Sequence, residues 1–440
     1  MYKKLVAPSV VQVELTSRCT NKCVHCYNFW RGKKEREDSE ICLREARILA
    51  DQIIFNKVFH VIITGGEPFL NKDSLYFLAK ALISNGLTVG INSNLTVLSE
   101  KDILYLKELG ITLVLTSIMG PNSKVHDNIA KRKGAFNETV NGIKRLQKAN
   151  LPVAANMVVS QMNKKYVKST ARFIKSLGLN HFSATKVSWP GNCKDFSNLS
   201  LTIDEFHNYL QDLYEIGIEE GINVDVLESY PLCGIKEVNK FRKFTGRKCL
   251  AGITTMTIGS NGSVRPCSHL DINYGNIFKD NLKDIWDKMI VWRNGNILPS
   301  RCKSCSIFGL CGGGCRMEAK MKNEMITTLD PYAIPENIPY VVSQITSRKK
   351  KSLKSLPDVF QLNPKTRLRK EEFGGTLFIG PKFACYLNKT GFRLIKKLKI
   401  GRVYNKKKIS KFSLGSSFNL DIERFFEKMF DRKVLIYNQH

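Results

Sequence analysis

Three cysteines near the start of the chain have the spacing of a metal-binding loop. Cys19, Cys23 and Cys26 form a C-x3-C-x2-C pattern, and three thiolates from one loop can bind three irons of a four-iron, four-sulfur cluster. The fourth iron then stays open to a small molecule. A structural zinc site needs a fourth Cys or His at similar spacing, and His25 is poorly placed to supply it. The pattern favours a cluster with an open iron over zinc.

Most of the other cysteines form a second group. The chain has 13 cysteines, and residues 1–9 lack the apolar run of a secretory signal, so we expect metal or redox chemistry rather than a disulfide framework. We expect a cytoplasmic protein. The members of this second group are Cys249, Cys267, Cys302, Cys305, Cys311 and Cys315.

The elements that position the first loop follow an alternating pattern. Short β-branched runs alternate with amphipathic helical stretches such as 43–55 and 75–84, which is typical of a parallel α/β unit. Six strands are predicted, at residues 10–15, 60–64, 88–92, 112–116, 153–159 and 181–185. Right-handed helical crossovers curl such strands into a full or partial barrel, whose chemistry lies in the loops after the strands' carboxyl ends. The first cysteine loop follows strand one, and a Gly-Gly-Glu-Pro run follows strand two.

Residues 19–27, read as Cys-Thr-Asn-Lys-Cys-Val-His-Cys-Tyr after a strand, resemble the radical S-adenosylmethionine (SAM) superfamily, and residues 65–68 resemble its second motif. This resemblance implies that SAM binds the open iron and that reduction cleaves it to methionine and a 5′-deoxyadenosyl radical. That radical removes hydrogen from an unactivated C–H bond. Flavodoxin or ferredoxin would supply the electron.

The same resemblance implies a set of residues that contact SAM. Backbone around the two glycines accepts from the SAM amino group, the tyrosine lies beside the adenine, and the asparagine and serine approach the ribose or carboxylate. The set is Tyr27, Gly65, Gly66, Glu67, Pro68, Asn94 and Ser117. The chain departs from the family where Ser-Asn-Leu at 93–95 replaces Thr-Asn-Gly, and where residues 117–121 lack the usual aspartate. A tight turn is the alternative role of the glycine pair.

The second cysteine group resembles the SPASM extension of peptide- and protein-modifying radical SAM enzymes, which binds one or two auxiliary iron-sulfur clusters. The resemblance assigns Cys249, Cys267 and Cys315 to the first auxiliary cluster, with the upstream Cys233 as its fourth ligand. It assigns Cys302, Cys305 and Cys311 to the second auxiliary cluster.

The closing ligand of the second auxiliary cluster is missing. A cysteine normally follows Asp-Pro-Tyr, and here Ala333 follows Tyr332. An open iron, an oxygen ligand such as Asp330, and loss of the cluster with zinc or structural roles for the thiols are the alternatives, and we favour the first two. Cys42, Cys193 and Cys385 match no motif, and we expect them to pack in apolar cores.

Positive charge is concentrated at the end of the chain. The net charge is +30, and residues 331–440 hold 24 basic and 8 acidic side chains, which indicates an acidic partner or a solvated basic surface. Residues 366–378 and 386–391 resemble the PqqD-like family of peptide-recognition domains. That family is winged-helix-like and adds a leader peptide as a strand to a sheet edge. We expect no nucleic-acid partner, because no RNA-binding motif is found, and no membrane partner, because the apolar face within 392–400 fits a small core.

The expected organisation is an α/β chain with a partial (β/α)6 TIM-like barrel at 1–200 and a SPASM domain at 201–335. A basic linker at 336–360, with a basic run at 348–351, then leads to a PqqD-like α+β domain at 361–440. The predicted function is radical SAM modification of a ribosomally made precursor peptide, by a thioether or carbon–carbon crosslink or related chemistry. A protein-modifying enzyme of the anaerobic sulfatase-maturase type, a tRNA-directed enzyme and an electron-transfer protein are the alternatives.

Overall fold

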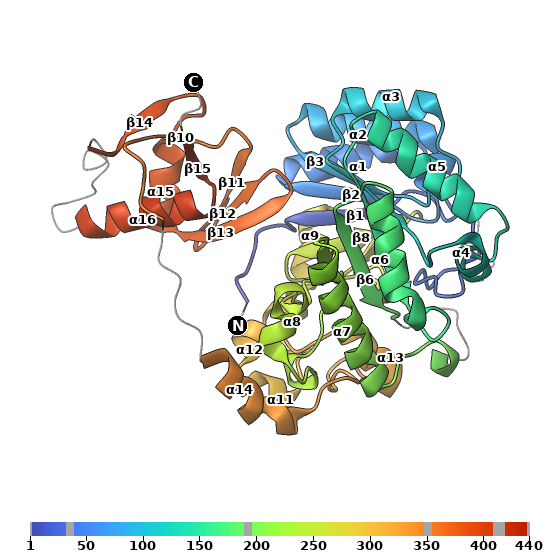
Figure 1. Ribbon diagram of the computed structural model, residues 1–440. Coiled ribbons are helices and arrows are strands. Elements are labelled where there is room, and N and C mark those ends of the chain that lie inside the picture. The colour runs from blue at the N-terminus through green and yellow to red at the C-terminus, as the bar shows by residue number, and fades with distance from the viewer. Residues whose placement is uncertain (1, 32–38, 189–195, 347–353, 408–418, 438–440) are drawn as a thin grey trace. The chain divides into compact units, whose positions relative to one another are not determined.

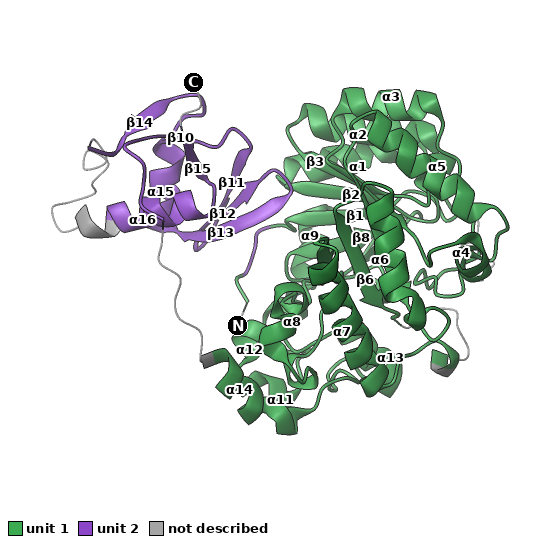
Figure 2. Ribbon diagram, in the orientation of Figure 1, with its two compact units in different colours: residues 1–3, 7–347 green, residues 4–6, 348–440 purple. Residues whose placement is uncertain are grey.

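The computed structural model describes residues 2–31, 39–188, 196–346, 354–407 and 419–437. The chain divides into two compact units, one of residues 1–3 and 7–347 and the other of residues 4–6 and 348–440 (Figure 2). Within the described residues, no helix is long and apolar enough to span a bilayer. The regions predicted as 1–200 and 201–335 both lie in unit 1, and the finer division into four parts stays a prediction.

A nine-stranded sheet runs through unit 1 in the order β7-β6-β5-β4-β3-β2-β1-β8-β9 (Figure 1). All pairs are parallel except β8 with β9. The strands are β1 (Val10–Glu14), β2 (His60–Thr64), β3 (Thr88–Asn92), β4 (Leu113–Ser117), β5 (Val153–Val159), β6 (His181–Lys186), β7 (Asn223–Asp225), β8 (Thr255–Ile258) and β9 (Val264–Arg265). The six predicted strands are present within a residue or two, and together they form the predicted TIM-like α/β fold.

Helices cover the outer face of the parallel strands (Figure 1). They are α1 (Leu43–Phe55), α2 (Lys72–Ser84), α3 (Glu100–Leu109), α4 (Ser123–Ala130), α5 (Ala135–Lys148), α6 (Val167–Ser176) and α7 (Ile203–Glu219). Each turns a buried apolar stripe toward the sheet, as Leu49 and Ile53 do in α1. Caps fix the starts of some of them: Thr202 accepts from the Glu205 N–H, while the Glu205 carboxylate accepts from the Thr202 N–H at 2.8 Å.

The cysteine-rich part of unit 1 is joined to the barrel by its main chain. β8 pairs in parallel with β1, from Val10 opposite Thr255 to Val13 opposite Ile258, so the sheet extends beyond the six predicted strands. The remaining elements are short: 3-10 turns η5 (Leu232–Gly234) and η6 (Pro335–Asn337), and helices α8 (Val238–Thr245), α9 (Leu282–Lys288), α10 (Ile290–Arg293), α11 (Ser300–Lys303), α12 (Phe308–Cys311), α13 (Arg316–Asn323) and α14 (Ile338–Thr346).

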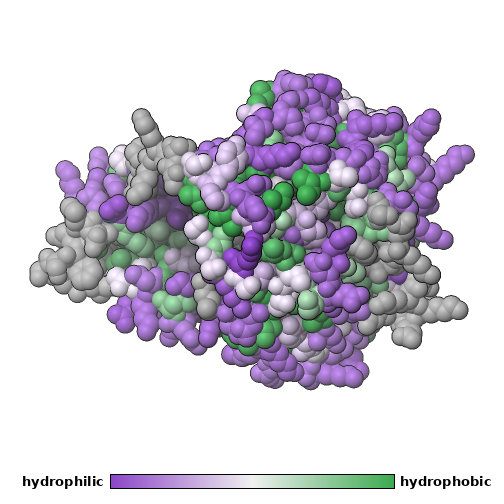
Figure 3. All heavy atoms as spheres, turned by 90° about the horizontal axis from the view of Figure 1, so that it is seen from below, coloured by the Kyte–Doolittle hydropathy of each residue, from purple (hydrophilic) through white to green (hydrophobic). Residues whose placement is uncertain are grey.

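The elements at the end of unit 1 expose some apolar side chains. Leu310 is 40%, Met325 59% and Tyr340 55% exposed, and Figure 3 shows apolar residues (green) among hydrophilic ones on the face seen from below. α14 lies where part of a linker was expected. The basic run at 348–351 lies outside the described residues.

Unit 2 contains a core of its own and is rich in β-structure. One sheet has the order β14-β10-β15 and the other the order β11-β12-β13. The elements are β10 (Val359–Leu362), β11 (Thr366–Glu371), β12 (Gly374–Ile379), β13 (Lys382–Asn388), α15 (Lys389–Lys397), β14 (Val403–Asn405), α16 (Asn419–Asp431) and β15 (Leu435–Tyr437). Side chains from both sheets and both helices pack together, with Phe360, Leu377 and Phe426 fully buried.

Three cysteines outside the motifs were expected to be buried. Cys385 is buried in the core of unit 2, as predicted. The prediction for Cys42 was wrong: this residue is exposed directly before α1, where its backbone N–H donates to the Glu45 carboxylate at 2.9 Å. The helix predicted at 43–55 begins at Leu43, and Cys42 is the residue before it. Cys193 lies outside the described residues.

Candidate active site and cysteine clusters

The first cysteine loop follows β1 and lies at the carboxyl ends of the parallel strands. Cys19, Cys23 and Cys26 are all partly exposed. The Asn94 amide nitrogen lies 3.6 Å from the Cys19 sulfur, and an Arg31 guanidinium nitrogen lies 3.7 Å from the Cys26 sulfur. Amide and guanidinium donors therefore face thiols that carry negative charge when they bind metal.

The three thiols are close enough to affect one another's ionisation. Burial, and then the neighbouring thiolates of Cys26 and Cys19, raise the pKa of Cys23 to about 12. Three thiolates of this kind need cations beside them, because burial and mutual repulsion both oppose their charge. Iron in a cluster meets that need, so this donor set fits the four-iron cluster that the spacing predicts.

The thiols do not converge on a single point. Across the part of the chain that the structure describes, no group of three His, Cys, Asp or Glu side chains could hold one metal ion. Ligands of a four-iron cluster bind separate irons and so stay farther apart than the ligands of a zinc ion. The spacing of the first loop is compatible with a cluster.

The glycine pair after β2 packs directly against the cysteine loop. A Cβ atom on Gly66 would lie 2.0 Å from the Arg18 carbonyl oxygen, and one on Gly65 would lie 2.5 Å from that of Thr16. The Gly66 N–H donates to the Thr16 carbonyl at 2.7 Å, and the Asn28 amide donates to the Gly65 carbonyl at 3.0 Å. Gly65 has a φ of +130°, which side chains oppose. These glycines hold the loop in place, and their expected contact with SAM stays a prediction.

Glu67 supports the next loop. Its side chain is fully buried and accepts from the Ser93 hydroxyl at 2.8 Å, the Asn94 N–H at 2.8 Å and the Phe69 N–H at 3.2 Å. Burial raises the pKa of Glu67 to about 7, although these donors favour its ionised form. Glu67 thereby positions Asn94, and Pro68 begins the following turn, Pro68–Leu70.

The structure brings Asn94 to the first cysteine loop. Its amide nitrogen also donates to the Thr20 hydroxyl at 2.9 Å. Ser117 ends β4 and is partly exposed at the same edge of the sheet. Both are where parallel-barrel enzymes bind their ligands, and the contacts to SAM that the resemblance implies stay predictions.

Tyr27 connects the first loop to the cysteine-rich region. Its ring stacks on His269, with centroids 4.5 Å apart and planes at 19°. Glu14 of β1, which acts electrostatically on Tyr27, forms a fully buried ion pair with Arg265 of β9, and the Trp30 indole donates to Glu14 at 3.2 Å. Because a buried charge needs its partner, this pair fixes β9 and the residues after it against the first loop.

One group of thiols in the cysteine-rich region comprises Cys249, Cys267 and Cys315. Burial, and to a smaller extent the Cys249 thiolate, raise the pKa of Cys267 to about 11. The Cys249 thiolate also acts on Cys315, whose pKa burial raises well above its usual value. The Cys249 thiol is thus an electrostatic neighbour of both other predicted ligands of the first auxiliary cluster.

A second group of thiols lines a small pocket beside α11 and α12. Cys302, Cys305 and Cys311 lie in its wall, as the spacing predicts, and Cys233 and Ala333 lie there with them. We expected Cys233 beside Cys249, Cys267 and Cys315, and the structure puts it with the other group. The spacing of a single cysteine far upstream could not indicate which group it joins.

Asp330 was a candidate ligand for the second group. Its side chain is buried, and its two oxygens accept from the Cys315 N–H at 2.7 Å and the Tyr332 N–H at 2.9 Å. Both oxygens are therefore engaged by the main chain. The carboxylate holds the start of α13, whose N-cap is Cys315, against the segment that leads to Ala333.

A buried charge cluster at the end of β6 was not predicted. The Lys186 ammonium lies 3.2 Å from Glu318 of α13 and 3.6 Å from Glu228, and it lies 4.7 Å from the centroid of the Tyr332 ring. Burial raises the pKa of Glu228 to about 7, although the Lys186 charge opposes that rise. A lysine at the end of a predicted barrel strand was the available signal, and its partners lie too far along the chain to be inferred.

Known proteins share both parts of unit 1. Residues 13–174 match the radical SAM superfamily, and residues 249–306 match the iron-sulfur cluster-binding SPASM domain. An AdoMet-dependent heme synthase of Methanosarcina barkeri is 27% identical over 354 residues, which cover 74% of this chain and 97% of that protein. The subtilosin biosynthesis protein AlbA of Bacillus subtilis is 25% identical over 320 residues, which cover 71% and 68%.

A solved structure shares the fold. Streptococcus suis SuiB bound to precursor peptide SuiA has a TM-score of 0.59 and 19% identity, with 74% of this chain and 75% of that chain covered. The thiol loop, the glycine pair and the cysteine-rich region agree with these matches. The chain therefore contains a radical SAM domain, which binds SAM and a four-iron cluster, and a SPASM domain, which binds auxiliary iron-sulfur clusters.

Proposed function

We propose that this enzyme modifies a ribosomally made precursor peptide, with unit 2 binding the peptide's leader. The observation that carries the proposal is unit 2 itself, a separately cored module in the most basic part of the chain. A leader with acidic side chains would be attracted by that charge. The proposed peptide substrate goes beyond the radical SAM and SPASM chemistry of unit 1.

Strand edges in unit 2 suit an extended peptide. β11 and β13 are the two edges of one sheet, and β14 and β15 are the edges of the other. An added strand gains main-chain hydrogen bonds from such an edge. β13 carries an aromatic cluster: Phe383 is 49% exposed, and its ring lies 4.7 Å from that of Tyr386 and 5.7 Å from that of Phe378. We infer that β13 receives the leader, with Phe383 contacting an apolar side chain.

The lengths of the relatives support a role for the additional module. The heme synthase of Methanosarcina barkeri aligns over nearly all of its own length but over 74% of this chain. About a quarter of this chain thus has no aligned counterpart there. A substrate-recognition module explains that extra length. SuiB, which shares the fold, has been solved bound to a precursor peptide.

The residues of the site have separate tasks in this proposal. Cys19, Cys23 and Cys26 would hold the cluster, Asn94 and Arg31 would hydrogen-bond its sulfur ligands, and Gly66 and Glu67 would hold the surrounding loops. When bound, the cluster and SAM supply hydrogen-atom abstraction from an unactivated C–H bond. A low-potential donor such as flavodoxin or ferredoxin would deliver the electron, in the cytoplasm. The thioether or carbon–carbon crosslink is the proposed class of product.

A binding titration followed by product analysis tests the proposal. The full chain is titrated against a fluorescently labelled short peptide encoded beside its gene, and anisotropy is measured. The reconstituted enzyme with SAM and dithionite should then release 5′-deoxyadenosine and remove two hydrogens from the peptide, as mass spectrometry would report. Bulk tRNA serves as the competing ligand. Absence of peptide binding, or equal binding of tRNA, would contradict the proposal.

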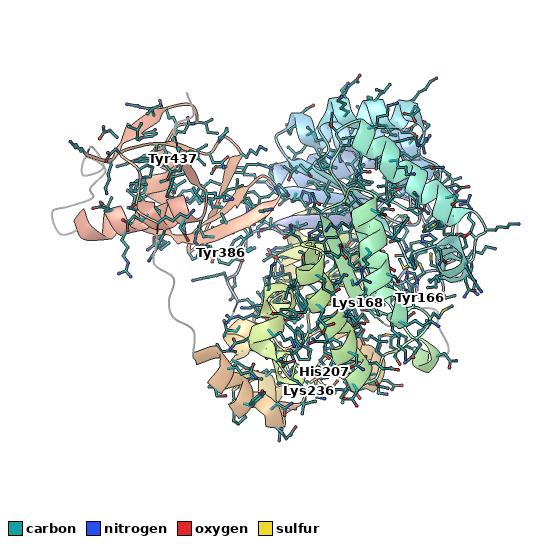
Figure 4. The ribbon with its side chains drawn as sticks, viewed as in Figure 1. Tyr166, Lys168, His207, Lys236, Tyr386 and Tyr437 are labelled. Carbon is teal, nitrogen blue, oxygen red and sulfur yellow. The ribbon has the colours of Figure 1, made fainter. Side chains whose placement is uncertain are left out.

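Two matched variants locate the leader on unit 2. Phe383→Ala should weaken peptide binding by about tenfold, which is about 1.4 kcal/mol. Tyr437→Ala is the control, because Tyr437 is 64% exposed on β15, an edge of the other sheet (Figure 4). Equal losses of peptide affinity in both variants would contradict the proposal that the leader binds at β13.

Haem biosynthesis is the second candidate, because relatives in Methanosarcina barkeri are an AdoMet-dependent heme synthase and an Fe-coproporphyrin III synthase. In that case the enzyme would act on an iron porphyrin or its precursor rather than on a peptide. Incubating the reconstituted enzyme with iron coproporphyrin III and following the product mass separates the two functions. Turnover of the porphyrin without peptide turnover would establish the second candidate.

A further inference from the structure

The pocket beside α11 and α12 gathers four cysteines instead of the three that the motif provides. Cys233, Cys302, Cys305 and Cys311 all line it. Its other wall residues are mostly apolar, including Ile307, Phe308 and Ile338, so the wall itself offers few polar groups to stabilise a thiolate. Four thiols around one pocket are the donor set of a fully coordinated four-iron cluster.

Cys233 is held in this pocket by the main chain of its own turn. It lies in η5, where the Gly234 N–H donates to the Pro231 carbonyl at 2.9 Å. The Leu232 N–H donates to the Cys311 sulfur at 3.3 Å, so this turn directly contacts a thiol of the second group. His207 Nε2 lies 2.9 Å from the Gly234 carbonyl, and Figure 4 shows His207 on α7 beside Lys236.

The turn of Cys233 also packs against the segment that lacks its cysteine. A Cβ atom on Gly234 would lie 1.8 Å from the Tyr332 carbonyl oxygen, a distance that only glycine permits. The Asn337 amide donates to the Cys233 carbonyl at 3.3 Å. Residues 233 and 333 are therefore neighbours in space, although a hundred residues separate them in the sequence.

We propose that Cys233 is the fourth ligand of the second auxiliary cluster, with Cys302, Cys305 and Cys311, and takes the place left by Ala333. The inference goes beyond the proposed function and does not depend on a peptide substrate. The second auxiliary cluster is then closed by four cysteines, and its iron has no vacant position for a substrate. Within the described ranges, Cys249, Cys267 and Cys315 are then the auxiliary group that is left with three cysteine ligands.

Iron and sulfide analysis of full-length variants tests the ligand. In a background with Cys19, Cys23 and Cys26 replaced by alanine, Cys233→Ala should remove close to four irons and four sulfides per chain, or leave a three-iron cluster with its own EPR signal. Cys42→Ala, at an exposed cysteine outside the clusters, is the control and should change neither. Unchanged iron, sulfide and EPR spectra in Cys233→Ala would overturn the proposal.

Two further backgrounds decide which cluster Cys233 serves. When Cys302, Cys305 and Cys311 are already alanine, adding Cys233→Ala should remove no more iron. When Cys249, Cys267 and Cys315 are already alanine, the same change should remove the remaining auxiliary cluster. The reverse pattern would assign Cys233 to the first auxiliary cluster and overturn the proposal.

A position swap and a labelling experiment guard against misfolding of the variant. Cys233→Ala combined with Ala333→Cys should restore the lost iron, because the two positions face the same pocket. In the unmodified holoenzyme, Cys233 should resist alkylation by iodoacetamide and become reactive when iron is removed by a chelator, as peptide mass mapping would report. Equal labelling of Cys233 in the presence and absence of iron would overturn the proposal without any mutation.

Discussion

The first cysteine loop takes its thiols from residues 19–26, whereas the pocket beside α12 draws on residue 233 and residues 302–311. Both places rely on one glycine for close packing. Gly66 lies against the Arg18 carbonyl and Gly234 against the Tyr332 carbonyl, with no room for a Cβ atom at either. Both also use one buried carboxylate to fix main-chain N–H groups: Glu67 in the first place and Asp330 in the second. The two sites therefore use the same kinds of contact, but the residues of the first site are close in the sequence and those of the second site are far apart.

The largest predicted effect concerns the first loop. Replacing Cys19, Cys23 and Cys26 together by alanine should abolish SAM cleavage, because no thiolates remain there to hold the cluster. The measurement is 5′-deoxyadenosine release under anaerobic conditions with dithionite. Cys385→Ala, at a buried cysteine of unit 2, serves as the control and should keep its activity. Release of 5′-deoxyadenosine by the triple variant would contradict the assignment.

The glycine pair offers a selective test of the comparison. Gly66→Ala should displace the cysteine loop and reduce iron at the first cluster, while Gly234→Ala should displace Cys233 and reduce iron at the pocket. Overpacking of this kind also costs about 1–3 kcal/mol of unfolding free energy. Gly309→Ala is the control, because a Cβ atom there meets nothing within 4 Å. Iron counts and EPR would show the selectivity, and loss of the same cluster in both variants would break the comparison.

Local patterns explain what the sequence could reveal. The strands of the barrel are runs buried on both faces, such as His60–Thr64 and Val153–Val159, and such runs are recognisable without knowledge of their neighbours. The first cysteine loop and the glycine pair each lie within a few residues. The start of α1 at residue 43 was predicted correctly, but Cys42, the residue before it, matches no motif, so nothing in its local sequence indicated that its side chain is exposed.

Non-local contacts explain what the sequence could not reveal. β8 pairs with β1, although most of the barrel's sequence lies between the two strands. Lys186 likewise pairs with Glu318 of α13, which is far along the chain. Cys233 lies in a stretch with no motif of its own. Its neighbours in the pocket can be identified only once the structure shows that η5 contacts residues 332–333. Pairing of such distant segments is a property of the packed chain, and one sequence carries no record of it.

A substitution in the buried charge cluster of Lys186, Glu228 and Glu318 tests how the barrel and the cysteine-rich region are joined. Lys186→Met should lower the free energy of unfolding by about 3–5 kcal/mol, because Glu228 and Glu318 then remain buried without their cation. Lys168→Met is the control: Lys168 pairs with Glu215 on the surface between α6 and α7 (Figure 4), and surface pairs are worth about 0–1 kcal/mol. Urea denaturation would measure both, and equal effects would refute the role of the cluster.

Substitutions of the two buried carboxylates should have smaller effects on stability than Lys186→Met, and they separate a structural role from a ligand role. In Asp330→Asn the side-chain oxygen can still accept one N–H. The amide nitrogen is itself a donor and would face the second N–H, so we expect a cost of about 1–3 kcal/mol of unfolding free energy. Glu67→Gln should cost a similar amount for the same reason. Iron at the pocket should stay unchanged in Asp330→Asn, because Cys233 and not Asp330 closes the cluster. Loss of pocket iron in Asp330→Asn, with Glu67→Gln retaining it, would make the carboxylate a ligand and end the parallel between the two sites.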